Sequence, residues 1–348
     1  MDWAEGLTFP DGSHAMETWR SNIWEKTLSF VKMVHAEGGL DLFLGYLYPS
    51  QIDVGAIREL QRKGIPCVNF FCDNVREFRS VPTAFFPFDL HWVPEFEALP
   101  MYRKAALPFL HAPMPCWIPN QLRTVSTTES EPPTFLGSAD TLRKNLFSKA
   151  IFAGAEILIR GPGWDESNRQ IHELKTNSKK WQRVINQYLF TKKHGLLSPG
   201  AKLINALYPN ISIEIPKKHF APTVFGEEYF KVTRTSKITL GVNRVPAARR
   251  PWIWPLKYSR LRDIEAPMLG ACYLTEYTEG VAMLYDLGKE IETYRTPFEL
   301  VEKVNELLAS PQKRAELRSA GQKRALKDHS VPATLKKILL RLGQAHNR

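Results

Sequence analysis

An alternation of strand, helix and strand near the start of the chain restricts its fold most strongly. DLFLGYLY (41–48) is an apolar run of strand length, and the helical stretch that follows (54–64) ends in Gly64, a plausible C-cap. IPCVNFF (65–71) is a second apolar run. Because the predicted helix between the two strands is short, this order predicts a parallel βαβ unit.

The pattern extends and then begins again after a break. FDLHWV (88–93) and ALPFLHAP (106–113) are two further predicted strands. TVSTTESEPP (124–133) is polar and aperiodic, which indicates a linker. Beyond it we expect strands at 134–137, 155–161, 237–242, 271–276 and 290–294, and helices at 142–154, from Pro297 and from Pro311.

The sequence therefore predicts two α/β domains in tandem with a cleft between them. Its 348 residues are too many for one ordinary core. We expect domains at 1–123 and 134–330, followed by a basic helix at 331–348. Residues 165–215 are polar and Lys-rich around a helical middle, and are interpreted as an insertion. In such sheets ligands bind beyond the carboxyl ends of the strands.

Composition favours a cytoplasmic protein. No run reaches the roughly 18 to 20 apolar residues of a membrane helix, and the N-terminus lacks the apolar core of a secretory signal. The four cysteines show no CxxC spacing and no histidines at metal-ligand intervals, which argues for a reducing compartment and against a structural metal site.

The net charge of +11 is concentrated near the C-terminus. Residues 312–348 carry ten Lys or Arg against Glu316 and Asp328, about +8. Such an excess favours anionic partners, namely nucleotide diphosphates, acidic surfaces or nucleic acid. It also fits a solvated helix face, so charge alone names no function.

Two strand ends carry candidate site residues. Asp73 follows 65–71 and is a candidate base or hydroxyl ligand, or else closes an Asx-turn. Gly137 ends the strand at 134–137, and Arg143 lies in the helix that follows. A helix N-terminus there offers N–H groups to an anion, and an ordinary strand-to-helix turn is the alternative.

A third strand end carries Gly161-Pro162-Gly163-Trp164. This turn would let a base or sugar ring approach the backbone. Trp164 either stacks on such a ring or covers the core. The lysine of a phosphate-binding loop does not follow, so this is not a Walker-type site.

The segment 257–280 is richest in charge. Arg262 and Glu265 stand at the start of a helix that then becomes apolar. A carboxylate there can accept both hydroxyls of a ribose, and arginines can neutralise a diphosphate without a metal. A salt-bridged helix start is the structural alternative. A strand-end loop on the ligand side then supplies Thr275, Glu276 and Thr278.

The order of motifs in 257–330 resembles the C-terminal region of group 1-like glycosyltransferases, and specifically the branch of CgeB-like spore-maturation proteins. R-x-x-E is followed by A-x-x-x-G, a strand ending in L-T-E, G-K-E-I-x-x-Y, a helix pair, A-G-x-x-R and a histidine. These motifs correspond to Arg262, Glu265, Gly270, Thr275, Glu276, Gly288, Lys289, Glu290, Tyr294, Ala320, Gly321, Arg324 and His329.

The resemblance implies the GT-B fold, with two Rossmann-like domains, the donor bound by the second and the acceptor by the first. It implies no cofactor and no obligatory metal. The donor is a nucleotide diphosphate sugar, with Glu265 on its ribose and Arg262, the helix N-termini and Arg143 on its diphosphate. The acceptor is a hydroxyl of a glycan, lipid, small molecule or nucleic acid.

Two departures from the family pattern affect the mechanism. Lys257 stands where retaining relatives carry a second glutamate, so the stereochemistry stays open and Lys257 is a candidate phosphate ligand. No buried strand is predicted before Leu40, so the first domain is abbreviated or the chain starts late. The acceptor base is then sought among His14, Asp73 and His91.

Two other functions stay open. One is a DNA-base glycosyltransferase, for which the basic tail would be the electrostatic footprint. The other is a homologue without catalysis that binds a nucleotide sugar or a partner protein.

Overall fold

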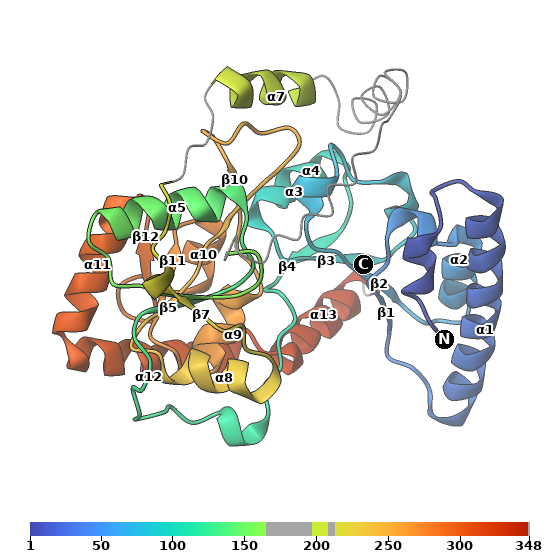
Figure 1. The fold of residues 1–348 in the computed structure, drawn as a ribbon. Coiled ribbons are helices and arrows are strands. Elements are labelled where there is room, and N and C mark those ends of the chain that lie inside the picture. The colour runs from blue at the N-terminus through green and yellow to red at the C-terminus, as the bar shows by residue number, and fades with distance from the viewer. Residues whose placement is uncertain (165–196, 208–212, 347–348) are drawn as a thin grey trace. The chain divides into compact units, whose positions relative to one another are not determined.

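A computed structural model describes residues 1–164, 197–207 and 213–346. The chain divides into two compact units. Unit 1 comprises Met1–Pro113 and Pro332–Arg348, and unit 2 comprises Met114–Val331. Both units are coloured along the chain in Figure 1. The predicted helical middle of the insertion at 165–215 lies outside the described residues.

Unit 1 is built on a parallel four-stranded sheet in the order β1-β2-β3-β4. Its strands are β1 (Phe43–Gly45), β2 (Cys67–Phe70), β3 (Leu90–Val93) and β4 (Phe109–His111). Its helices are α1 (His14–Gly38), α2 (Val54–Arg62), α3 (Asn74–Glu77), α4 (Leu99–Lys104) and α13 (Val331–His346). The predicted βαβ unit is thereby confirmed.

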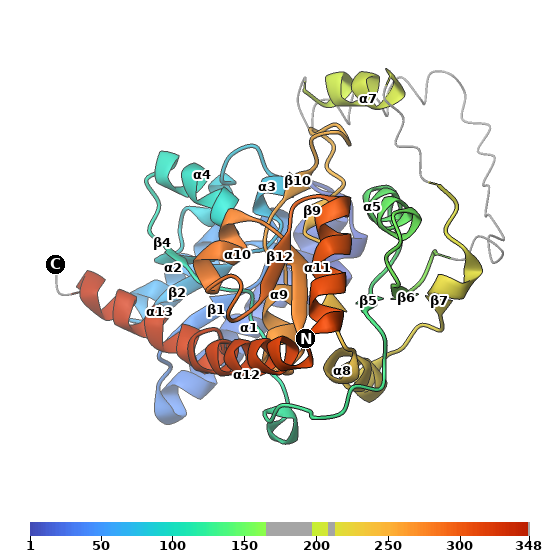
Figure 2. The same cartoon turned by 90° about the vertical axis from the view of Figure 1, so that its left-hand side faces the viewer.

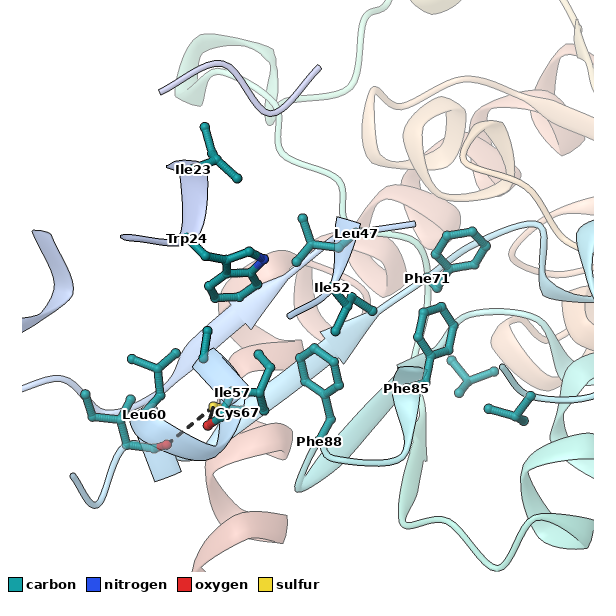
Figure 3. Close-up of a cluster of buried hydrophobic side chains, with 14 of the residues drawn as sticks. Ile23, Trp24, Leu47, Ile52, Ile57, Leu60, Cys67, Phe71, Phe85 and Phe88 are labelled. Atoms are coloured by element: carbon teal, nitrogen blue, oxygen red, sulfur yellow. Dashed lines mark hydrogen bonds between the residues drawn. The ribbon is translucent and has the colours of Figure 1, made fainter. Parts of the chain in front are cut away.

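The long helix α1 was not predicted from the sequence. Ser13 caps it by accepting from the backbone N–H of Met16. Its inner face contributes Trp19 and Trp24 to the core of unit 1. Figure 3 shows part of this core, in which Trp24 and Ile57 belong to the same cluster as Phe71, Phe85 and Phe88 from the turns between β2 and β3. The helix therefore covers the sheet of a unit whose first strand is β1.

Unit 2 is built on a parallel six-stranded sheet in the order β12-β11-β8-β5-β6-β7. Its strands are β5 (Thr134–Leu136), β6 (Leu158–Arg160), β7 (Phe220–Ala221), β8 (Thr239–Leu240), β11 (Tyr273–Glu276) and β12 (Glu292–Tyr294). A separate antiparallel hairpin pairs β9 (Arg244–Val245) with β10 (Leu256–Lys257). The predicted strands of this half are confirmed, and β7, β9 and β10 are additions.

Helices cover both faces of the second sheet. The helices of unit 2 are α5 (Thr141–Phe152), α7 (Leu197–Leu207), α8 (Gly226–Thr235), α9 (Arg262–Met268), α10 (Glu279–Leu284), α11 (Pro297–Ala309) and α12 (Pro311–Asp328). One core lies under α5 and α11, and a second under α9, α10 and α12. Figure 2 shows α5 and α11 side by side. Burial on both faces explains the nearly continuous apolar runs of these strands.

Short 3-10 turns connect several of these elements. They span Glu5–Thr8, Pro49–Gln51, Thr83–Phe85, Phe96–Ala98, Asn120–Leu122 and Lys217–His219.

The polar segment 124–133 is held against unit 2. Glu129 accepts from the guanidinium of Arg314 at 2.9 Å, and Glu131 pairs with Arg160 at 2.9 Å. Glu131 also bridges to the backbone of Ser236. This segment was predicted as a linker because it is polar, and its acidic side chains are the groups that anchor it.

Much of the basic charge near the C-terminus is used inside unit 2. Arg314 and Arg318 are buried and bind Glu129 and backbone carbonyls. Lys313 pairs with Glu292 and Glu306. The prediction of a solvated basic helix face therefore holds for only part of α12. Fewer of its basic side chains are available to an external anion than the composition suggests.

Candidate functional site

The candidate donor site lies at the carboxyl edge of the six-stranded sheet. Because all six strands are parallel, their carboxyl ends meet at one edge. Gly137 follows β5, Gly161 follows β6, Asn243 stands beyond β8, and Glu276 ends β11. The sequence-predicted residues of the second domain are therefore gathered at this edge or at the starts of the helices that follow it.

Two glycines at this edge bring neighbouring strand ends very close together. A Cβ on Gly161 would stand 2.1 Å from the carbonyl oxygen of Gly137, and the Gly161 φ of +152° also disfavours a side chain. The indole Nε1 of Trp164 donates to the same carbonyl at 2.7 Å. Gly161 is thus required by the backbone itself, whereas a Cβ on Gly137 would meet the ring of Phe135 at 2.9 Å.

Trp164 belongs to the core of unit 2. Its side chain is 4% exposed and packs against Phe135, Phe147 and Phe220. The core-covering alternative is favoured, because a ring buried on this scale has no face left for a ligand.

The start of α5 is already capped. Asp140 accepts from the backbone N–H groups of Leu142 and Arg143, both at 2.9 Å. The predicted free N–H groups at this helix start are therefore occupied by a carboxylate of the chain itself. Arg143 contributes through its side chain instead: Nε pairs with Asp140 at 3.2 Å, and Nη1 donates to the Ser138 carbonyl at 2.9 Å.

Glu265 and Arg262 converge on a tyrosine from a neighbouring helix. The hydroxyl of Tyr229, in α8, donates to Oε2 of Glu265 at 2.5 Å. The guanidinium of Arg262 lies over the same ring, 5.3 Å from its centroid. The Nη1 atom of Arg262 is buried without a hydrogen-bond partner among the described residues. Tyr229 therefore fixes the carboxylate, and Arg262 retains capacity to bind an anion.

Three arginines share this region. Burial lowers the pKa of Arg143; the carboxylate of Asp140 opposes this shift, and the positive charges of Arg260 and Arg262 add to it. The positive charges of Arg260 and Arg262 are therefore near enough to act on the Arg143 guanidinium. A bound anion would offset these charges, which is the electrostatic property a diphosphate site requires.

Asp263 holds the start of α9 against the sheet. Its carboxylate accepts from the Tyr273 hydroxyl at 2.8 Å, from the Thr275 hydroxyl at 2.9 Å and from the backbone N–H of Arg260 at 2.9 Å. Burial raises the pKa of Asp263, and these hydrogen bonds oppose the rise. The Thr275 hydroxyl therefore binds Asp263 within the protein, and does not face a ligand as predicted.

Glu276 is fully buried between two cations. Arg244 binds it through Nε at 3.0 Å and Nη2 at 2.6 Å, and Lys257 Nζ lies 2.7 Å from Oε1. Burial opposes ionisation, but the hydrogen bonds and charges of Arg244 and Lys257 outweigh it and lower the pKa of Glu276. Both Glu276 and Lys257 were predicted to face the ligand, yet each binds the other.

Thr278 is an N-cap rather than an open loop residue. Its hydroxyl accepts from the backbone N–H of Val281 at 3.1 Å and begins α10. The side chain of Thr278 is buried. It therefore makes a structural contact, where a ligand-facing position was predicted.

Unit 1 carries the predicted acceptor-side residues. Asp73 stands directly beyond β2 in the left-handed region, with φ 62°, and begins α3. His14 is exposed on the first turn of α1, not in a polar loop. His91 is fully buried in β3, and burial lowers its pKa to about 4. His91 is therefore excluded as an acceptor base, because it contacts no solvent.

Sequence reasoning missed Arg244, Asn243 and Tyr229. Asn243 donates to the Glu276 carbonyl at 2.8 Å, and Arg244 binds its carboxylate. The rule applied to the other strand ends would have found both, because they follow the predicted strand 237–242. No comparable signal existed for Tyr229, which lies in a helix the sequence did not predict.

Two parallel α/β sheets in tandem, the second with an arginine-rich carboxyl edge, are the arrangement that the resemblance to GT-B glycosyltransferases predicts. Residues 143–339 match the family described as "Glycosyl transferase-like". The match covers more than half of the chain, which therefore belongs to this family. No curated protein matches it in sequence.

Solved structures agree on the fold. HepE of Anabaena, in complex with UDP and glucose, gives a TM-score of 0.58 at 10% identity over 96% of this chain and 84% of its own. Sucrose-phosphate synthase of Thermosynechococcus elongatus gives 0.53 at 14% identity over 98% and 80%. A glycosyltransferase of Rickettsia africae gives 0.54 at 10% identity over 97% and 83%.

Two further results bear on the setting of the site. Among residues 1–164, 197–207 and 213–346, no helix is long and apolar enough to cross a membrane. All four cysteines are free thiols, and three of them are buried.

Proposed function

We propose that this chain transfers a sugar from a nucleotide diphosphate sugar to an acceptor hydroxyl, and that the carboxyl edge of the unit 2 sheet binds the donor. The observation that carries this proposal is the convergence of Glu265 and Arg262 on Tyr229 at that edge. A carboxylate and a guanidinium held by one ring match the two ends of a nucleoside diphosphate.

Glu265 would accept the ribose hydroxyls. The 2.5 Å hydrogen bond from Tyr229 holds its carboxylate in one orientation, which lowers the entropy lost on binding. Arg262, with Arg143 beside it, would bind the diphosphate and stabilise the charge that develops on the leaving group. This assigns charge neutralisation to side chains rather than to a metal.

The supporting residues would act indirectly. Gly137 and Gly161 let the strand ends close on each other, and Asp263 fixes the start of α9. UDP-sugars are the first donors to test, because HepE binds UDP and UDP-glucose. We assign the chain to the CgeB-like branch on its motif order, and to the cytoplasm on its free cysteines.

Asp73 would be the acceptor base. It stands at the carboxyl end of β2, where a strand-end carboxylate can take a proton from a hydroxyl. His14 is the second candidate, exposed at the start of α1.

Binding of the donor is tested by thermal shift of the full chain against UDP-, GDP-, dTDP- and CMP-sugars. A ligand at 100 times its Kd stabilises the native state by about 2.7 kcal/mol, so one nucleotide should stand out. Glu265→Ala should abolish most of that shift, whereas Glu302→Ala, an exposed glutamate on α11, should leave it intact. An undiminished shift in Glu265→Ala would remove the ribose assignment.

Turnover is tested by release of the nucleoside diphosphate with a panel of acceptors. We expect Asp73→Asn to lower kcat by about 10² to 10⁴ while preserving the donor thermal shift. His14→Ala should leave kcat unchanged, and the reverse result would exchange the two roles. A donor shift without any turnover would favour the non-catalytic alternative.

A further inference from the structure

The hairpin of β9 and β10 carries an exposed apolar tip in unit 2. Between its strands runs PAARRPWIWP (246–255). At the base of the hairpin, Arg244 and Lys257 bind Glu276 and so belong to the candidate donor site. The tip takes no part in those contacts, and the proposed transfer reaction leaves it unexplained.

The tip has a defined conformation. The backbone N–H of Arg250 donates to the Ala247 carbonyl at 3.1 Å, and that of Trp254 donates to the Pro251 carbonyl at 3.0 Å. The N–H of Trp252 donates to the side chain of Asn205, in α7, at 2.7 Å. These hydrogen bonds fix two successive turns and attach them to a helix.

Large apolar side chains point outward from this framework. Trp254 is 63% exposed and Ile253 is 45% exposed. Leu203 and Leu207 are also exposed, but they lie on the side of α7 opposite Asn205 and therefore face away from the hairpin. Figures 1 and 2 both show α7 at the outer end of this hairpin. We call Ile253 and Trp254, with Arg250, the tip patch.

The chain segment that carries the tip patch is basic in sequence. No Asp or Glu occurs between Glu228 and Asp263, while that stretch contains nine Lys or Arg. Within the tip itself Arg250 is exposed, whereas Arg249 is half-buried. A partner for this surface must therefore tolerate indole and aliphatic side chains and supply negative charge.

An anionic bilayer surface has both properties. Tryptophan partitions to the headgroup region, aliphatic side chains enter the acyl boundary, and arginine binds lipid phosphate. A nucleic acid would use Arg250 but offers no apolar region to Ile253 and the indole of Trp254. We propose that the tip patch docks this protein onto the surface of a membrane that contains anionic lipid. The sequence suggested the basic C-terminus for such a contact, but α12 uses much of its charge internally.

The test is co-flotation of the full chain with phosphatidylcholine vesicles and with vesicles of phosphatidylcholine and phosphatidylglycerol at 7:3. We expect binding to the anionic vesicles that weakens as salt is raised. Ile253→Ser with Trp254→Ser should lower the partition coefficient at least tenfold. Arg250→Gln should lower it about fivefold, because one arginine near an anionic surface contributes about 1 kcal/mol.

Phe298→Ser provides the matched control, since Phe298 is an exposed aromatic on α11 at 69% and lies next to Glu299. It should leave vesicle binding unchanged. Donor thermal shift in each variant reports folding, so a loss of vesicle binding in a folded variant supports the proposal.

Four results would overturn it. They are unchanged flotation of the double variant, an equal loss in Phe298→Ser, equal binding to neutral vesicles, and no binding to either vesicle. Two more would name another occupant: a dimer by sedimentation that the double variant abolishes, or salt-sensitive binding to a duplex DNA that Arg250→Gln abolishes without vesicle binding.

Discussion

Two buried glutamates, one in each unit, stand at the carboxyl ends of central parallel strands and differ in charge. Glu276 ends β11 and is 0% exposed, whereas Glu95 follows β3 and is 1% exposed. Glu276 has Arg244 and Lys257 within hydrogen-bond distance. Glu95 accepts the backbone N–H of Asn74 through Oε2 at 2.8 Å, and its Oε1 has no hydrogen-bond partner among the described residues.

The partners decide the protonation state. Burial raises the pKa of Glu95 to about 8, and its hydrogen bond from Asn74 only partly opposes this. At Glu276 the two cations reverse the effect of the same burial. At the strand edge of unit 2 the buried carboxylate is therefore held ionised, whereas at that of unit 1 the buried carboxyl is held neutral. The cations at the edge of unit 2 suit the anionic donor proposed there, and the neutral carboxyl of unit 1 suits the proposed hydroxyl-bearing acceptor.

Glu276→Gln should have the largest effect on stability. It leaves Arg244 and Lys257 buried or half-buried without their carboxylate, which costs about 3–5 kcal/mol. Urea unfolding of the full chain, followed by tryptophan fluorescence, measures the loss. In the wild type this contribution is present above about pH 4.5 and is lost as pH falls through the lowered pKa. Glu279→Gln, at an exposed neighbour, should cost far less, and equal losses would contradict the ion-pair account.

Glu95→Gln should stabilise the protein at high pH, the opposite of the effect of Glu276→Gln. The native state keeps the Glu95 proton up to about pH 8, whereas the unfolded chain loses it near 4.5, so wild-type stability falls as pH rises between these values. Glutamine cannot ionise and can still accept from Asn74. We expect the variant to be more stable than wild type by on the order of 2 kcal/mol at pH 8.5 and nearly equal to it at pH 5. Thermal melts at the two pH values decide this, and a pH-independent difference would show that Glu95 stays ionised.

Lys257→Met should have the smallest effect. Its ammonium is one-third exposed, and Arg244 remains on Glu276, so the cost should be about 1 kcal/mol or less. The same urea experiment measures it. A loss as large as that of Glu276→Gln would make Lys257, not Arg244, the principal partner.

The sequence was sufficient where pattern and local chemistry agree. Apolar runs bounded by turns located β2, β5 and β11, and Thr296 caps α11 as its motif predicts. The predicted charged helix start at Arg262 is also observed. These features depend on neighbouring residues alone, so one sequence contains what is needed to find them.

The remainder depended on contacts between distant residues. Glu276 and Thr275 are conspicuous in sequence, but their partners Arg244 and Asp263 lie 32 and 12 residues away. Trp164 looks like a stacking ring until Phe220 covers it. Pairing of this kind decides whether a polar residue faces a ligand or the protein, and spacing along the chain does not specify it.

The division of the chain has a consequence for its synthesis. Unit 2 is continuous, so all of its residues leave the ribosome before the last helix of unit 1 does. Unit 1 includes α13, which follows Pro113 by more than two hundred residues. Domains generally fold as units during synthesis. Unit 2 should therefore complete its core before unit 1 receives its last helix.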